Sequence, residues 1–266
     1  MSCFNNKAVW ITGASSGIGE ALTYALAKAG ARLILSARNV PALEQVKQQS
    51  ESKNIYILPL DLTEPDTFEV KTQEAIRAFG QVDILVHNGG ISQRSYIRDT
   101  EMAVYRRIME VDYFGYVGLT KAILPHFVKR QAGHFVVVSS VLGKLTTPMR
   151  AAYASAKHAL HGFFDGLRAE YWQKNITVTM ICPGYVRTQI AVNALTATGE
   201  AYNQMGKDTG GGYPADRCAL QMMRAIKRKK NEVYVGKPLG KEKLALLLKR
   251  FFPGLLAKIA RKAAPQ

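Results

Sequence analysis

Short apolar runs alternate with longer amphipathic segments along most of the chain. The apolar runs predict seven strands, at residues 8–12, 32–36, 55–60, 83–87, 134–139, 177–182 and 232–235. Several runs, such as 33–35 and 135–138, contain no polar residue. Continuously apolar strands are typical of a parallel sheet that helices cover on both faces.

The segments between the strands predict helices at 17–29, 41–52, 64–79, 101–129, 152–174 and 214–229. Strands that alternate with helices indicate right-handed βαβ units, and therefore an α/β fold with a doubly wound, seven-stranded parallel sheet. The 266 residues are enough for one well-packed domain, which we expect to span residues 1–239.

Two stretches interrupt this alternation. Residues 187–213 follow the sixth predicted strand and contain Gly206, Gly210, Gly211 and Gly212. A long glycine-bearing segment at the carboxyl edge of a sheet predicts a lid over a ligand. The second stretch, residues 240–266, forms a basic tail that Pro253 and Gly254 are expected to split into two short helices.

The positive charge of the chain is concentrated near its C-terminus. The formal net charge is +16, and residues 224–266 hold thirteen Lys or Arg against two Glu, a local charge of +11. The tail also carries apolar side chains, at Leu244, Leu247, Leu248, Phe251 and Phe252. This pattern predicts an amphipathic surface helix with two alternatives: it lies in an anionic membrane interface, or it packs on the enzyme body or a second subunit.

Other partners and locations are less favoured by the sequence. The tail has an apolar side and no recognisable DNA-reading module, so we expect no nucleic-acid partner. No apolar run reaches eighteen residues, and the N-terminus lacks the pattern of a signal peptide. We therefore expect a cytoplasmic protein, with peripheral contact at a membrane surface as the additional possibility. Cys3, Cys182 and Cys218 are scattered, which predicts neither a disulfide framework nor a metal site.

A glycine-rich turn follows the first predicted strand. It contains Gly13, Ser15, Ser16, Gly17, Ile18 and Gly19. Glycines permit a tight turn and close backbone approach, and the following helix offers free N–H groups to a pyrophosphate. The turn therefore predicts dinucleotide binding on a Rossmann-type fold.

The end of the second predicted strand distinguishes between two dinucleotides. An acidic residue at this point would bind the ribose 2′-hydroxyl of NAD, but the chain has Ala37. Arg38 can pair with a 2′-phosphate instead. The cofactor predicted here is NADP(H), with NAD as the less favoured alternative.

Tyr153 and Lys157 are spaced i, i+4 in a predicted helix and therefore share one face. A free tyrosine has a pKa of about 10, which is high for a base at neutral pH. A neighbouring ammonium favours the phenolate and lowers that pKa. The pair is thus a candidate acid/base centre, and Lys157 could also bind a nicotinamide ribose.

Taken together, these motifs resemble the short-chain dehydrogenase/reductase family in its compact single-domain form. The turn matches TGxxxGIG, and Ser140 lies thirteen residues before Tyr153, as in the family. The remaining matches are Asp61 and Leu62 for the adenine-contacting pair, Asn88 and Gly89 within the counterpart of NNAG, and Pro183, Gly184, Val186 and Thr188 within PGxxxT. The body is most similar to hydroxysteroid and retinol-type dehydrogenases.

The resemblance implies an oxidoreductase that interconverts a primary or secondary alcohol with its aldehyde or ketone. Ser140 would hydrogen-bond the substrate oxygen, Tyr153 would exchange the proton, and Lys157 would tune Tyr153. Steroids, retinoids and long-chain acyl compounds are the substrates that the resemblance favours. It also implies a homodimer through the predicted helices at 101–129 and 152–174, and no metal.

The chain departs from the family pattern at three positions. His87 and Gly90 replace the first and last residues of NNAG, and a glycine at the end should loosen the turn. Asp112 stands where the family has an asparagine that helps to hold a proton-relay water. A carboxylate here would raise the pKa of Tyr153 and oppose Lys157. Asp112 is thus also the one feature that favours an alternative, a non-catalytic NADP(H) sensor.

Overall fold

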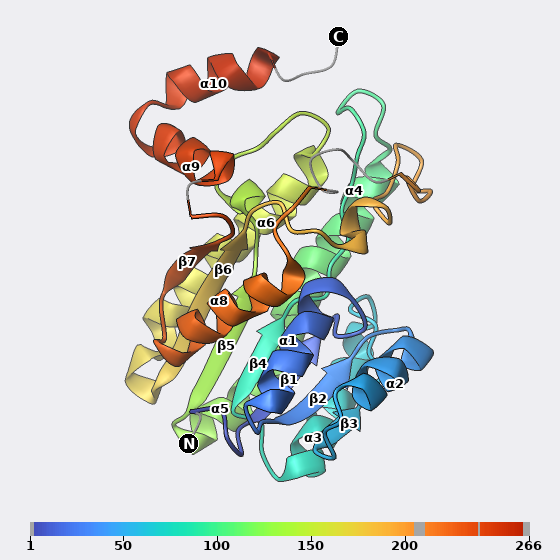
Figure 1. Ribbon diagram of the computed structural model, residues 1–266, viewed down its shortest axis with the longest axis vertical. Coiled ribbons are helices and arrows are strands. Elements are labelled where there is room, and N and C mark those ends of the chain that lie inside the picture. Colours follow the sequence, from blue (N-terminus) through green and yellow to red (C-terminus); the bar gives the residue numbers. More distant parts are fainter. Residues whose placement is uncertain (1–2, 205–210, 239, 263–266) are drawn as a thin grey trace.

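Seven parallel strands form one central sheet in the order β3-β2-β1-β4-β5-β6-β7 (Figure 1). The computed structural model describes residues 3–204, 211–238 and 240–262. The strands are β1 Ala8–Thr12, β2 Arg32–Ser36, β3 Ile55–Ile57, β4 Ile84–His87, β5 Gly133–Val138, β6 Ile176–Pro183 and β7 Glu232–Val235. The predicted seven-stranded doubly wound sheet is confirmed.

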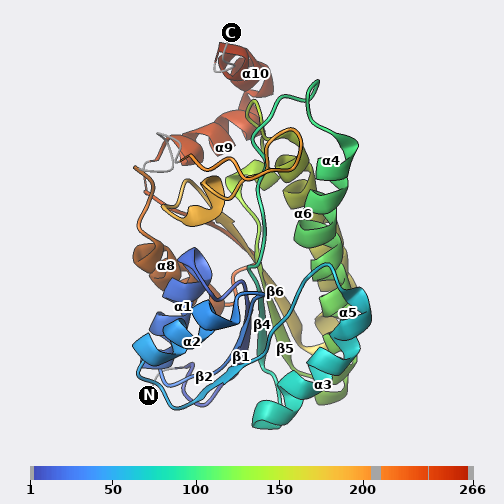
Figure 2. The same ribbon diagram turned by 90° about the vertical axis from the view of Figure 1, so that its right-hand side faces the viewer.

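Helices cover both faces of the sheet (Figure 2). One face holds α1 Gly17–Lys28, α2 Val40–Gln49 and α8 Ala215–Lys227. The other holds α3 Phe68–Phe79, α4 Met102–Met109, α5 Gly115–Arg130 and α6 Ala151–Tyr171. The order of β1 between β2 and β4 reverses the direction of winding, and the carboxyl ends of these strands are where such folds bind ligands.

The strand side chains point alternately into two apolar cores. On β1, Val9 and Ile11 pack under α1, whereas Trp10 packs toward the α3 and α5 side. On β5, Val136 packs in the same core as Val9 and Ile11, whereas Phe135 packs in the same core as Trp10. Burial on both faces explains why these strands lack the polar alternation of a half-exposed sheet.

The segment predicted as one helix over 101–129 is interrupted. A π-helical turn, Glu110–Phe114, separates α4 from α5. A π turn accommodates one residue more than an α turn and often occurs at functional sites. Hydrophobic periodicity does not reveal this interruption, because the segments on both sides remain amphipathic.

The tail forms two helices, α9 Lys241–Phe251 and α10 Pro253–Lys262, as the Pro253-Gly254 break predicts. They extend beyond the carboxyl end of the sheet (Figure 1). Among their described residues none is buried. Ala245, Leu246 and Leu256 nevertheless contact an apolar cluster that includes Leu142 and Tyr153. Within the described part of the chain, no helix is long and apolar enough to span a bilayer.

The predicted lid is partly described. A short 3-10 helix, Gln189–Ala191, follows β6, and Leu195 bridges to both Gln93 and Ala201. The segment is thereby attached to the loop after β4. Gly206 and Gly210 of this prediction lie outside the described residues.

Candidate functional site

The glycine-rich turn between β1 and α1 forms a close-packed cradle. Gly13 and Gly17 have φ of +64° and +60°, a conformation that L side chains rarely adopt. A Cβ on Gly19 would lie 2.2 Å from the carbonyl oxygen of Gly13. Ser16 precedes α1 but its side chain does not cap the helix. The first N–H groups of α1, which include those of Gly17 and Ile18, are therefore available to an anion such as a pyrophosphate.

The loop after β4 is bonded directly to this turn. The Asn88 side chain donates to the carbonyl oxygens of Thr12 and Gly13, at 3.0 and 3.1 Å. The backbone N–H groups of Asn88 and Gly89 donate to Thr12 Oγ1, at 3.0 and 3.1 Å. The turn and the loop are thus held as one unit, which fixes the shape of the cradle.

Arg38 and Asp61, two predicted cofactor residues, meet at the ends of β2 and β3. The Arg38 Nη1 atom lies 4.0 Å from Asp61 Oδ2, and the arginine side chain is exposed. Leu62 is buried next to Gly89. An exposed guanidinium at this edge is accessible to a phosphate group.

The segment after β6 faces the same turn. Thr188 Cγ2 would lie 3.0 Å from a Cβ on Gly17, so the Thr188 side chain packs against the backbone of this turn. Pro183 ends β6, and Gly184 N–H donates to the carbonyl of Val235 at 2.9 Å. Val186 is buried and pairs with Tyr213.

The three candidate catalytic residues come from two neighbouring elements. Tyr153 and Lys157 lie one turn apart on α6, and Ser140 follows β5. Lys157 Nζ lies 5.5 Å from the centre of the Tyr153 ring and 5.2 Å from that of Tyr116. The Ser140 hydroxyl accepts the N–H of Leu142 at 3.1 Å. These contacts place a hydroxyl, a phenol and an ammonium at the carboxyl end of β5.

The π turn directs Asp112 into this centre. Its Oδ2 atom lies 3.1 Å from Lys157 Nζ, and its Oδ1 accepts the N–H of Ile91 at 2.8 Å. Lys157 also donates to the carbonyl of Val138 at 3.2 Å. Both members of the ion pair are buried. A buried charge requires such partners, so Asp112 is the main counterion of Lys157.

The pKa values of the buried pair are shifted by burial and by mutual attraction. Burial raises the pKa of the Asp112 carboxyl, although Lys157 and the N–H of Ile91 oppose the shift. Burial opposes the charge on Lys157, yet the pKa of its ammonium is raised, because Asp112 and the phenols of Tyr116 and Tyr153 together outweigh burial. The lysine therefore stays protonated.

Tyr153 remains a phenol in this environment. Burial raises its pKa above the ordinary value of 10.0, and the Asp112 carboxylate adds to the shift. Lys157, Ser140 and Arg150 act in the opposite direction without reversing it. A protonated Tyr153 can donate a proton at neutral pH, and it becomes a base only when the pH is high or its environment changes.

Gly90 and Asp112, two residues that depart from the family pattern, lie next to each other. A Cβ on Gly90 would lie 3.0 Å from Asp112 Oδ2 and 3.3 Å from its Cγ. That separation is tighter than ordinary van der Waals contact, so an alanine at this position would press on the carboxylate. Gly90 therefore provides the space in which Asp112 meets Lys157. The third departure, His87, is buried and bonds Thr120 Oγ1 through Nε2 at 2.8 Å.

A polar cluster behind the catalytic residues was not predicted. His161, Cys182 and Glu232 place one potential metal-ligand atom each within 4.8 Å of the others. Lys144 Nζ lies 2.6 Å from Glu232 Oε2, and Ser139 Oγ lies 3.1 Å from His161 Nε2. The lysine already neutralises the carboxylate, and burial raises the pKa of the Cys182 thiol to about 12. The cluster links α6 to β6 and β7, and its members are too far apart in sequence to form a motif.

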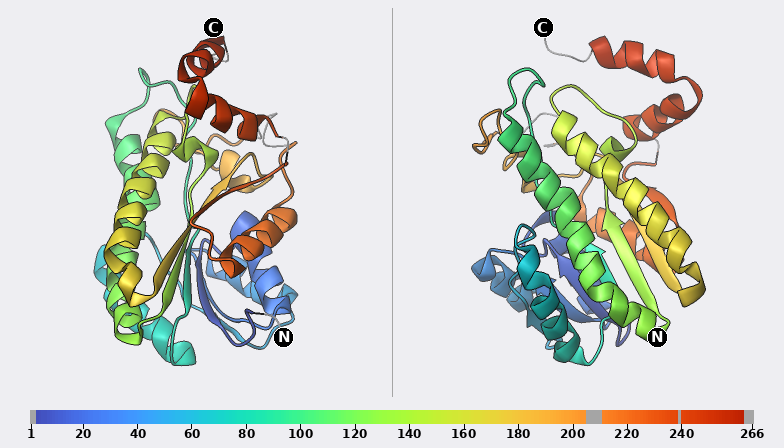
Figure 3. Two further views of the ribbon diagram at one scale, coloured as in Figure 1. Left: turned by 90° about the vertical axis from the view of Figure 1, so that its left-hand side faces the viewer. Right: turned by 180° about the vertical axis from the view of Figure 1, so that it is seen from behind.

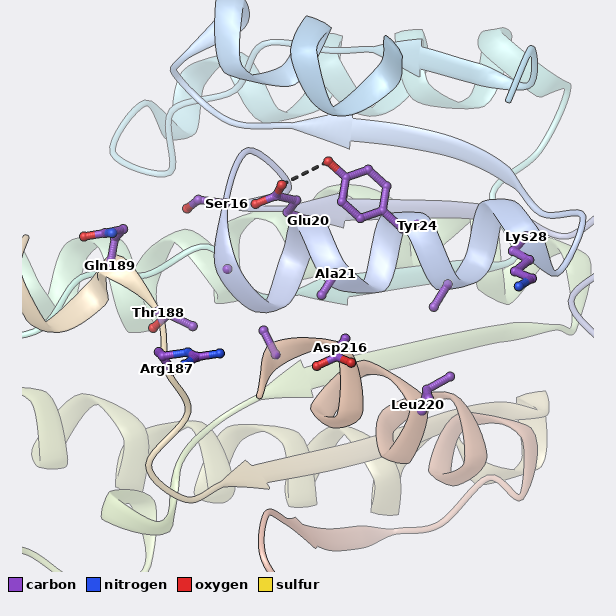
Figure 4. A pocket seen from close by; sticks show the side chains of 13 residues that line it. Ser16, Glu20, Ala21, Tyr24, Lys28, Arg187, Thr188, Gln189, Asp216 and Leu220 are labelled. Carbon is purple, nitrogen blue, oxygen red and sulfur yellow. Dashed lines mark hydrogen bonds between the residues drawn. The ribbon is translucent and has the colours of Figure 1, made fainter. Parts of the chain in front are cut away.

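A groove of about 780 Å³ begins at the cofactor turn and continues along the outer faces of α1 and α8 (Figure 4). Ser16, Gly17 and Thr188 line the part next to the turn, and Lys28 and Leu220 lie toward the far end. Ser140, Tyr153 and Lys157 do not line it. The groove therefore overlaps the expected cofactor path but not the reacting centre.

This combination of fold and motifs is that of a Rossmann-type, nucleotide-binding oxidoreductase. A family model described as short chain dehydrogenase matches residues 7–198. The chain therefore belongs to the short-chain dehydrogenase family, as the sequence motifs predicted.

Curated relatives support the same assignment over most of the chain. Dehydrogenase/reductase SDR family member 7B from Mus musculus is 40% identical over 265 residues, which are 97% of this chain and 81% of the relative. Dehydrogenase/reductase SDR family protein 7-like from Drosophila melanogaster is 42% identical, with 97% and 80% covered. The similarity thus includes the C-terminal region after residue 198.

Solved structures share the fold. A short-chain dehydrogenase from Streptomyces avermitilis has a TM-score of 0.79 and 26% identity, with 96% of each chain covered. A Burkholderia phymatum enzyme in complex with NAD has a TM-score of 0.82 and 20% identity, covering 100% of this chain and 99% of its own. A Burkholderia cenocepacia enzyme in complex with NADP has values of 0.80 and 21%, with 100% of both chains covered. These solved structures thus include one enzyme in complex with NAD and one in complex with NADP.

Proposed function

We propose that this chain is an NADP(H)-dependent oxidoreductase that interconverts a lipophilic alcohol and its ketone or aldehyde. The observation that carries the proposal is the convergence of Ser140, Tyr153 and Lys157 beside the glycine cradle. The cradle fits a dinucleotide, because Gly13 and Gly19 leave no room for a Cβ and α1 begins with uncapped N–H groups. When bound, NADP(H) supplies or accepts the hydride.

Each residue of the centre has a defined task in this proposal. In reduction, Ser140 donates a hydrogen bond to the substrate carbonyl oxygen, and Tyr153 gives that oxygen its proton. In oxidation, the Tyr153 phenolate removes the proton of the alcohol. Lys157 stabilises the phenolate and holds the nicotinamide ribose. Asp112 positions Lys157 and offsets part of its charge.

The preference for NADP(H) rests on the edge formed by Arg38 and Asp61. Ala37 provides no carboxylate for a ribose 2′-hydroxyl, whereas the exposed Arg38 can pair with a 2′-phosphate. The guanidinium lies 4.0 Å from Asp61, the residue that the family resemblance assigns to the adenine, which supports this role.

The first test measures binding and turnover separately. The protein is titrated with NADPH and NADH, and loss of NADPH absorbance is then followed with a panel of lipophilic ketones and aldehydes. Tyr153→Phe keeps the ring but removes the hydroxyl group that donates the proton. Turnover should therefore fall about 10²- to 10⁴-fold while NADPH binding is retained. Equal turnover by the wild type and this variant would overturn the assignment of Tyr153.

A non-catalytic NADP(H) sensor is the alternative function, and the buried Asp112–Lys157 pair favours it. The carboxylate offsets the charge that would otherwise activate Tyr153. A sensor would bind NADPH and consume none of it with any ketone, in both the wild type and Asp112→Asn. Turnover that appears only in Asp112→Asn would show that the carboxylate suppresses an otherwise competent site.

The C-terminal helices support a proposal of peripheral membrane contact. Leu244, Leu247 and Phe251 are exposed on α9 although its other side contacts the body. Lys243 and Lys249 are exposed on the same helix and suit an anionic headgroup layer. Replacing the three apolar residues with Gln should abolish sedimentation with phosphatidylserine-containing liposomes. Unchanged sedimentation would favour packing of these residues on a second subunit.

A homodimer is the proposed assembly, with α5 and α6 at its interface. These helices lie side by side on one face of the molecule (Figure 3). Gly162 and Gly166 on α6 have open space where a Cβ would be, and their i, i+4 spacing puts them on one helix face. Light scattering should report a dimer for the wild type and a monomer for Gly166→Glu. A Gly166→Glu protein that stays dimeric would remove α6 from the interface.

A further inference from the structure

Arg150 lies near the candidate proton donor Tyr153, and it bonds the backbone of Gln93, the residue before Arg94. Arg94 lies in the loop after β4, and Arg150 is the residue immediately before α6. Arg150 precedes Tyr153 by three residues, and its charge favours the Tyr153 phenolate. Both loops lie at the carboxyl end of the sheet, where the family places its substrate.

Both guanidinium groups contact uncharged groups of the described residues. Arg150 Nη1 donates to Ser92 Oγ at 3.0 Å and to the carbonyl of Gln93 at 2.8 Å. The Arg94 guanidinium lies 5.0 Å from the centre of the Tyr202 ring. Among the residues that the structure describes, no carboxylate lies within ion-pair distance of either arginine.

Another half-buried arginine, Arg130, differs from Arg94 and Arg150 because it has an acidic partner. Arg130 Nη2 lies 2.8 Å from Asp83 Oδ1, so its charge is paired inside the protein. By contrast, burial and the nearby charge of Arg94 both lower the pKa of Arg150. The N-terminus of α6 adds a further partial positive charge at the same place. Two like charges kept together, with no carboxylate among the described residues to pair with them, create a site that an anion would stabilise.

We propose that the substrate carries an anionic group, a carboxylate or a phosphate, that binds Arg94 and Arg150 while its carbonyl lies at Ser140 and Tyr153. This inference rests on the proposed oxidoreductase function and names the substrate class of the same site. The apolar part of the substrate contacts the cluster that borders Tyr153 and contains Leu142, Leu145 and Leu246. The substrate class is therefore an amphipathic carbonyl compound with an acidic end.

Matched substrates test the proposal through turnover. Straight-chain keto acids with increasing separation of carbonyl and carboxylate are compared with their methyl esters in the presence of NADPH. The wild type should prefer one acid over its ester. Arg94→Gln should reduce that acid-to-ester ratio of kcat/KM about tenfold, because a charge-assisted hydrogen bond is lost. Arg98→Gln is the control, since Arg98 is exposed and pairs with Asp99; it should leave the ratio unchanged.

Arg150 has a structural contact with the loop that holds Ser92, so it needs a variant that keeps the charge. Arg150→Lys should retain part of the acid preference, and Arg150→Gln should lose it. Equal rates for acid and ester in the wild type would overturn the proposal. So would an equal response of the ratio to Arg94→Gln and Arg98→Gln, since only Arg94 lies at the proposed anion site.

A binding measurement separates this inference from the proposed function and identifies the anion. Calorimetry with NADP-loaded protein compares octanoate, octyl phosphate and octanol, and it requires no turnover. Tighter binding of octanoate or of octyl phosphate than of octanol supports the anion site and distinguishes carboxylate from phosphate. Equal binding of all three would overturn the anion site even if ketones are reduced. An anion that binds to a protein without turnover would instead contradict the catalytic proposal alone.

Discussion

The lysine of the candidate catalytic centre and the lysines of the C-terminal helices lie in contrasting environments. Lys157 is buried and contacts Asp112 and the carbonyl of Val138. Lys243 and Lys249 on α9 are exposed and share their helix with exposed apolar side chains. The same side chain therefore depends on fixed partners in one region and on solvent in the other. Substitutions should consequently have large effects at the centre and small effects on the folding of the tail.

The largest effect on stability is expected from removing the amine of Lys157. Lys157→Met leaves the Asp112 carboxylate buried without its counterion, which should lower the free energy of unfolding by about 3–5 kcal/mol. Burial raises the pKa of Asp112 in the folded state, so the folded variant binds the proton more tightly than the unfolded chain does. Its stability should therefore fall as the pH rises through the Asp112 pKa.

Urea unfolding of Lys157→Met between pH 5 and 8 tests this expectation, and the double variant Asp112→Asn/Lys157→Met is the control. Removing both charges should recover much of the lost stability and its pH dependence. If the single and double variants unfold at the same urea concentration at every pH, the unpaired Asp112 carboxylate does not destabilise the folded protein as predicted.

An intermediate effect is expected at Arg38, whose ion pair with Asp61 is largely exposed. Arg38→Gln should lower kcat/KM for NADPH about tenfold or more, because a charged contact with the 2′-phosphate is lost. The value for NADH should change little. Arg77→Gln, an exposed arginine on α3, provides the same change of charge elsewhere. A parallel loss with both dinucleotides would contradict the role given to Arg38.

Asp112→Asn should change the pH dependence of the reaction more than its maximal rate. Loss of the carboxylate removes one cause of the raised pKa of Tyr153, so this pKa should fall. Alcohol oxidation requires the phenolate, and its ascending limb should move to lower pH. Ketone reduction requires the phenol, and its descending limb should move in the same direction.

Steady-state profiles of kcat/KM in both directions check this shift. Glu110→Gln serves as the control because it changes the same charge within the same π turn, whereas Asp112 contacts Lys157 directly. Profiles that move equally in the two variants would indicate a general effect of charge.

The smallest effects on folding are expected on the outer side of α9. Leu247 is exposed, so Leu247→Gln should change the free energy of unfolding by no more than about 0.5 kcal/mol. Leu246, its neighbour, contacts the cluster around Leu142, and Leu246→Gln should destabilise the protein more. Urea unfolding of both variants measures the contrast. A larger loss in Leu247→Gln would mean that this side is covered by protein in solution.

Much of the fold was predictable because its signals are local. Apolar runs marked all seven strands, and glycines, Arg38, Ser140 and the Tyr153–Lys157 spacing marked the cradle and the candidate centre. The strand boundaries were less accurate: β3 ends at Ile57, although the sequence remains apolar beyond it. Backbone bonds to β2 continue past Ile57, since the N–H groups of Leu58 and Leu60 donate to the carbonyls of Leu35 and Ala37, whereas Pro59 between them has no N–H to donate.

The contacts that distinguish this chain from the general family pattern were not predictable. Gly90 and Asp112 each differ from the pattern, but no spacing rule relates them. A similar limit applies to Arg94 and Arg150, which are 56 positions apart and meet only because two loops end at one edge of the sheet. For the tail, hydrophobicity identified Leu244 and Leu247 as apolar positions but did not identify Leu246 as one of the residues that contact the body.

The sequence by itself determined the order of strands and helices, the dinucleotide cradle and the identity of the candidate proton donor, because each depends on residues close together in the chain. Only the tertiary structure decided which charges meet. The π turn directs Asp112 toward Lys157, and Gly90 leaves space for the carboxylate. The loops at the carboxyl edge bring Arg94 near Arg150, and among the described residues neither has an ion-pair partner. These electrostatic relations depend on distance and burial, which arise only when remote segments pack together.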